Sequence, residues 1–93
     1  MGINAHTDTF KFTAPLFPNT VYTWNPEENV VSWQDAVVTE EEILEALNAT
    51  GLPFELFDLF RQEVRGGKKS GKIDYHPEEV QNYIDNGTWK LVN

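Results

Sequence analysis

The chain has 93 residues, and its 15 acidic and 7 basic residues give a net charge of −8. This length fits one domain, because single cores usually extend to about 100–150 residues before chains divide. The negative charge argues against nucleic acid and anionic membranes as ligands, since both attract basic surfaces, and the absence of cysteine excludes disulfides and thiolate chemistry.

Residues 1–38 are typical of extended structure. Residues 10–13 alternate between apolar and polar side chains, which is the pattern of a half-buried strand. Residues 21–24 and 30–33 are rich in β-branched and aromatic side chains, and residues 25–29 between them supply the chemistry of a turn. The sequence therefore predicts a β-hairpin in this part of the chain.

Two prolines interrupt the segment Phe10–Trp33. Pro15 and Pro18 exclude a helix interior and keep the residues between them extended. Extended stretches spaced by prolines can lie across a neighbouring molecule, so this segment is also a candidate N-terminal arm.

A helix is expected to begin after Thr39. Thr39 and Glu42 have the spacing of a capping box, in which the threonine hydroxyl accepts the amide proton three residues later. Val38 and Ile43 stand at the two positions of a hydrophobic staple. Gly51 is suited to end this helix in a left-handed conformation.

A second helix is expected from Pro53 to about Arg65, ending at residues 66–67. Its apolar residues repeat at helical spacing and are Leu56, Phe57, Phe60 and Val64. This stripe predicts that Phe57 and Phe60 lie in the core.

The remaining residues predict a strand–helix–strand unit. A strand is expected at residues 72–75, a helix from Pro77 to residues 86–87, and a last strand at residues 89–91 that pairs with the first of these strands. The fold class is therefore α+β. One domain spans residues 1–93, with the extended segment followed by the helical α+β part from residue 39.

Neither a phosphate site nor a metal site is expected. Residues 66–72 have the spacing of a phosphate-binding loop, but that motif needs a strand before it and a helix after it. His76 lies near Glu78 and Glu79, yet this pattern is that of a helix beginning with acids in its first turn. We expect no catalytic residues, no cofactor and no metal.

Acidic residues gather along the two predicted central helices. The candidate docking residues among them are Glu41, Glu45, Glu55 and Asp58. A run of charge is often only a solvated helix face. Alternatively, such a surface attracts a basic partner protein and raises the rate of association.

Aromatic side chains are abundant, at 13% of the chain. In a small domain without disulfides, large aromatic residues usually fill the core. Trp24 and Trp33 flank the predicted hairpin, and one or both could instead anchor a partner, since aromatic residues are enriched at interface hot spots.

These features favour a non-catalytic module that docks stoichiometrically on a partner with a basic surface and can inhibit it. Small size, acidity, absence of cysteine and aromatic density resemble, as a class, the accessory proteins of phages and mobile elements. The alternative is a structural component of a larger assembly, such as a virion decoration or tail protein. We expect the chain in the host cytoplasm or in a virion, without direct binding to nucleic acid or membrane.

Overall fold

A computed structural model describes residues 2–15, 17–36, 38–48 and 54–92. The side chains of Leu47, Phe54, Glu55 and Phe57 are not among the described parts of the chain. The predictions made for Gly51, Pro53 and the side chain of Phe57 therefore lie outside the described residues.

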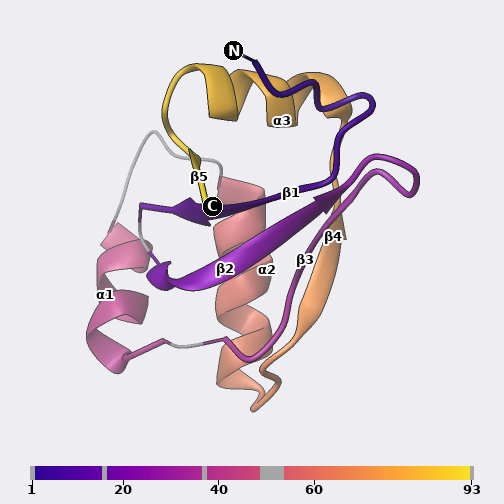
Figure 1. Cartoon of the computed structure of the whole chain (residues 1–93). Coiled ribbons are helices and arrows are strands. Elements are labelled where there is room, and N and C mark those ends of the chain that lie inside the picture. Colours follow the sequence, from indigo (N-terminus) through magenta and orange to yellow (C-terminus); the bar gives the residue numbers. More distant parts are fainter. Residues whose placement is uncertain (1, 16, 37, 49–53, 93) are drawn as a thin grey trace.

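Strands and helices occur in the order that the sequence predicts (Figure 1). The described elements are β1 (Phe10–Ala14), β2 (Phe17–Asn25), β3 (Val30–Trp33), α1 (Glu40–Asn48), α2 (Phe54–Arg65), β4 (Gly71–Asp74), α3 (Pro77–Asp85) and β5 (Lys90–Leu91). This is a single-domain α+β fold, which confirms the predicted class. The hairpin is confirmed as β2 and β3, joined by a turn at residues 26–29.

The strands form one antiparallel sheet in the order β4-β3-β2-β1-β5. The segment considered as an arm, Phe10–Trp33, supplies the three central strands of this sheet. It is part of the body of the molecule, because its apolar side chains form much of the core.

The predicted pairing of the last strand is wrong. β5 pairs with β1, where Leu91 lies opposite Phe12, while β4 pairs with β3, where Ile73 lies opposite Val31. The physical reason is that α3 leaves from one edge of the sheet and returns the chain at the opposite edge (Figure 1). β4 and β5, although consecutive strands in the sequence, therefore lie at opposite edges of the sheet.

Aromatic rings join one face of the sheet to α2 and α3. The Phe60 ring of α2 lies 4.6 Å from the Phe17 ring and 5.3 Å from the Trp33 ring, between ring centres. Near α3, Trp89 stacks on Phe12 at 4.3 Å. All five side chains are buried. Contacts of this geometry stabilise a core beyond the area they remove from water.

The N-terminal segment is fastened to this core at Ala5. The Trp24 indole Nε1–H donates to the Ala5 carbonyl oxygen at 2.7 Å, and the Ala5 amide donates to the Gln81 side-chain oxygen at 2.8 Å. Because Gln81 belongs to α3, these two bonds connect the segment to both β2 and the third helix.

Gly71 leaves room for the Trp33 indole beside the edge strand β4. The two residues face each other in the β3–β4 pair, and a Cβ on Gly71 would be 2.7 Å from Cζ2 of the indole. A side chain larger than hydrogen would therefore collide with the ring. The close approach explains why the first residue of this edge strand lacks a side chain.

The end of α2 confirms the stop predicted at residues 66–67. Gly67 has a φ of +87°, its amide donates to the Val64 carbonyl, and the Lys68 amide donates to the Glu63 carbonyl. These two bonds define a Schellman motif, which satisfies carbonyls at a helix end. A strand follows at Gly71–Asp74, so the order of elements is opposite to that of a phosphate-binding loop.

Candidate functional site

The predicted hydrogen bond from the Glu42 amide to the Thr39 hydroxyl caps the start of α1. The Glu42 amide donates to the Thr39 hydroxyl oxygen at 3.2 Å, and that hydroxyl lies 3.5 Å from the Glu42 carboxylate. Ile43 and Ala46 point inward and are buried, while Val38 packs partly buried against the core. The cap and these apolar side chains fix which side of α1 faces solvent.

Replacement of Thr39 by alanine is expected to lower the free energy of unfolding by about 1 kcal/mol, because it removes the acceptor for the Glu42 amide. Urea denaturation of the purified variant measures this change. Thr39→Ser retains the hydroxyl and serves as the control. Equal denaturation midpoints for the wild type and Thr39→Ala would contradict the role of this cap.

The outward side of α1 combines acidic residues with an exposed leucine. We call this surface the α1 face, and it consists of Glu40, Glu41, Leu44, Glu45 and Asn48. The Leu44 side chain is 55% exposed, the largest exposure among the large hydrophobic residues that the structure describes. Positions three and four apart are neighbours on a helix, so Glu40 and Glu41 lie beside this leucine.

The carboxylates of the α1 face are available to an incoming cation. Among the described residues, no basic side chain forms an ion pair with Glu40, Glu41 or Glu45. Glu40 and Glu41 belong to the first turn of α1, where the positive end of the helix dipole stabilises negative charge. The helix therefore holds three negative charges next to an apolar side chain without neutralising them.

Two of the four predicted acidic residues lie on the α1 face. Glu41 and Glu45 are exposed there, as docking requires. Asp58 is on α2 and is already engaged, since it pairs with Arg61 and accepts a hydrogen bond from the Gln62 side-chain Nε2–H at 2.9 Å. The fourth, Glu55, has a side chain outside the described residues.

Trp24 and Trp33 are placed in the core, where they cannot serve as surface anchors. Trp24 is 0% exposed and Trp33 is 2% exposed. Both occupy the inward positions of their strands, opposite Val31 and Tyr22 respectively. The two-residue period of a strand directs both indoles toward the helices, so neither belongs to the candidate site.

Sequence reasoning missed Leu44, although helical spacing contains a signal for it. Ile43 and Ala46 define the buried side of α1. One residue on from Ile43, a helix has turned by about 100°, which carries Leu44 away from that side. An apolar residue off the buried stripe of an otherwise acidic helix is the signal that singles out this position.

Glu42 differs from the other acids of α1 because it faces inward. One of its carboxylate oxygens is buried and makes no hydrogen bond among the described residues, as is also true of the Tyr22 hydroxyl. Burial raises the pKa of Tyr22 well above its usual range, and the Glu42 charge raises this pKa further. The Tyr22 phenol therefore remains neutral, and this cluster stays inside the fold.

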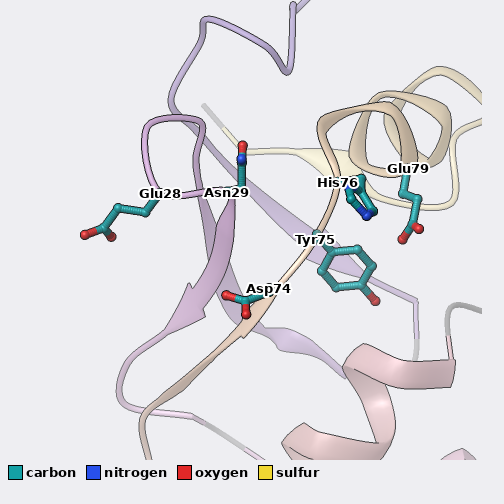
Figure 2. Close-up of a pocket in the computed structure, with 6 residues that line it drawn as sticks. All are labelled: Glu28, Asn29, Asp74, Tyr75, His76 and Glu79. Atoms are coloured by element: carbon teal, nitrogen blue, oxygen red, sulfur yellow. The ribbon is translucent and has the colours of Figure 1, made fainter.

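A pocket of about 360 Å³ lies where β4 meets α3 (Figure 2). It is lined by Glu28, Asn29, Asp74, Tyr75, His76 and Glu79. Figure 2 shows that Glu28 and Asp74 point away from His76 and Glu79. The Tyr75 hydroxyl accepts the Leu56 amide proton at 3.1 Å. His76 stands at the cap position of α3, as predicted.

The polar groups of this pocket do not converge on a common point. Among the described residues, no group of three or more histidine, aspartate and glutamate side chains could hold a metal ion. The α1 face is therefore the stronger candidate site.

Comparison with known proteins gives no match: the chain matches no family model, no curated protein and no solved structure. Among the described helices, none has the length and apolar character that a membrane span requires. Functional inference rests on the residues of the chain itself.

Proposed function

We propose that this chain is a non-catalytic protein-binding module whose α1 face docks on a basic surface of a partner protein. The observation that supports this proposal is the exposed Leu44 beside three carboxylates that form no ion pair within the described part of the chain, on a helix fixed by its cap and its buried side. A module of this kind acts stoichiometrically, and it inhibits a partner whose working surface it covers.

The two kinds of group on the α1 face have different tasks in this proposal. Glu40, Glu41 and Glu45 attract basic groups over distances of about a Debye length, which is roughly 8 Å at 0.15 M salt. Leu44 then loses its exposed apolar surface to the partner, which stabilises the complex at about 25 cal/mol per Å². The carboxylates thus govern the rate of association, and the leucine governs the lifetime of the complex.

The double substitution Glu41→Lys/Glu45→Lys is expected to slow association with the partner by about tenfold at low salt, because it reverses the steering charge. Folding should persist, since exposed charges usually contribute less than about 1 kcal/mol each. The partner is first isolated from native host lysate on the immobilised wild-type chain. Association rates are then measured by surface plasmon resonance at 0.02 M and 0.15 M salt.

The matched control is Glu27→Lys/Glu78→Lys, which changes the net charge by the same amount at two exposed positions outside α1. Retention of the wild-type rate by this control would assign the effect to the α1 face. The substitution Leu44→Ser should leave association nearly unchanged and accelerate dissociation. Equal slowing by both charge reversals would show that net charge alone acts, and it would contradict the proposed site.

A further inference from the structure

The sheet has one face packed against helices and one face open to solvent. Figure 1 shows α2 on the far side of β2 and β3, with no labelled helix on the near side. Outward positions of the strands make up the open sheet face, which includes Lys11, Val21, Thr23, Ser32, Lys72, Asp74 and Lys90. Antiparallel sheets commonly leave one face in water.

The charge of the open sheet face is opposite to that of the chain. The charged residues in the five strands are Lys11, Lys72, Lys90 and Asp74, which give a local charge of +2 in a chain of −8. The rest of the molecule therefore carries −10. Since the acids gather in the helices and turns, one molecule carries two surfaces of opposite sign.

A continuous row of polar residues crosses the open sheet face. Lys11 lies opposite Thr23, Thr23 opposite Ser32, and Ser32 opposite Lys72. Adjacent strands are about 4.8 Å apart, so the two lysines are about 14 Å apart. The row borders a hollow of about 320 Å³, in which the side chain of Val21 is 39% exposed.

The α1 face complements this row in charge and apolar content. Glu40 and Glu45 lie about 7.5 Å apart along the axis of α1 at 1.5 Å per residue, and the long glutamate and lysine side chains can span the difference from the spacing of the two lysines. Its carboxylates would meet Lys11 and Lys72, and Leu44 would meet the exposed Val21. The hydroxyls of Thr23 and Ser32 can donate hydrogen bonds to carboxylate oxygens.

We propose that the open sheet face binds the α1 face of a second copy of this chain. This proposal rests on the proposed function, because it uses the α1 face as the docking surface and names a second copy as its partner. The contact joins two different surfaces, so it is heterologous and repeats from copy to copy unless the rotation closes a ring. Self-association of this kind covers the α1 face of each copy that binds a neighbour. A contact that repeats from copy to copy is the kind that a component of a larger assembly uses.

Sedimentation equilibrium at 0.15 M salt tests this contact, because that salt concentration screens the repulsion between two chains of charge −8. The apparent mass of the wild type is expected to rise with protein concentration. Two variants should each remain monomeric, namely Lys11→Glu/Lys72→Glu, the sheet variant, and Glu41→Lys/Glu45→Lys, the helix variant. Lys68→Glu/Lys69→Glu, which changes two exposed lysines outside the strands, serves as the control and should associate as the wild type does.

Mixing the two variants provides the decisive measurement. Each variant alone has like charges on its two surfaces, but the mixture restores both opposite pairs. Equimolar sheet and helix variants should therefore associate at least about tenfold more tightly than either variant alone. Recovery in the mixture also shows that both variants are folded, since an unfolded chain would not regain the contact.

The self-association proposal would be overturned if the apparent mass of the wild type did not change up to millimolar protein concentration. It would also be overturned if the mixed variants associated no more tightly than either variant alone. Either result leaves the proposed function standing if the helix variant still loses its captured partner. If the helix variant keeps that partner at the wild-type rate, the proposed function fails, whatever the sedimentation shows.

Discussion

Phe60→Ala is expected to lower the free energy of unfolding by about 3–5 kcal/mol. The Phe60 side chain is fully buried, and its ring lies 4.6 Å from Phe17, 5.6 Å from Tyr22 and 5.3 Å from Trp33 between ring centres. Removing the ring leaves a cavity between α2 and two strands of the sheet, β2 and β3. Domains are commonly stable by only about 5–15 kcal/mol, so this loss is a large share of the total.

Urea denaturation followed by tryptophan fluorescence measures the effect, because Trp33 contacts the substituted ring. The control is Gln62→Ala, at an exposed position of the same helix. Apart from the loss of the Gln62 hydrogen bond to Asp58, this substitution should change the free energy of unfolding by less than about 0.5 kcal/mol. Denaturation of Phe60→Ala at the same urea concentration as this control would contradict the assigned packing of α2.

Trp24→Ala is expected to have an effect of similar size, again about 3–5 kcal/mol. The substitution removes a buried indole and also the hydrogen bond that holds the Ala5 carbonyl. Ala5 would then lose one of the two hydrogen bonds that the structure describes between it and the body of the molecule. A loss of partner binding in this variant would therefore report unfolding and would not identify an interface.

Trp24→Phe separates these two contributions. It retains an aromatic ring in the core but leaves the Ala5 carbonyl without its donor, which should cost about 1–3 kcal/mol. Hydrogen exchange at the Ala5 amide, which bonds to Gln81, should become faster in this variant. Unchanged exchange together with unchanged stability would show that the indole hydrogen bond does not hold the segment in place.

Local signals were sufficient to predict most of the elements of this fold. The alternation around Phe12 identified β1, the capping box at Thr39 identified the start of α1, and the glycine pair at 66–67 identified the end of α2. Each of these features depends on residues close together in the sequence, so no knowledge of the tertiary structure was needed.

Features that depend on distant residues were not predicted from the sequence. The pairing of β5 follows from the path of α3 around the end of the sheet, which no local motif specifies. Asp58 is a different case, because its partner Arg61 lies only three residues along α2, and helical spacing could have predicted this pair. The row from Lys11 to Lys72 exists only because the strand order places four separate segments side by side.

The strand order has a consequence for synthesis on the ribosome. The outer edge of β1 is made within the first fifteen residues, but its partner β5 comes from Lys90 and Leu91. Until β5 emerges this edge therefore has exposed backbone donors and acceptors, and such edges invite pairing with other chains. The nascent chain can complete its sheet only after Lys90 and Leu91 have left the ribosome, so we expect the edge of β1 to stay open while the intervening elements are made.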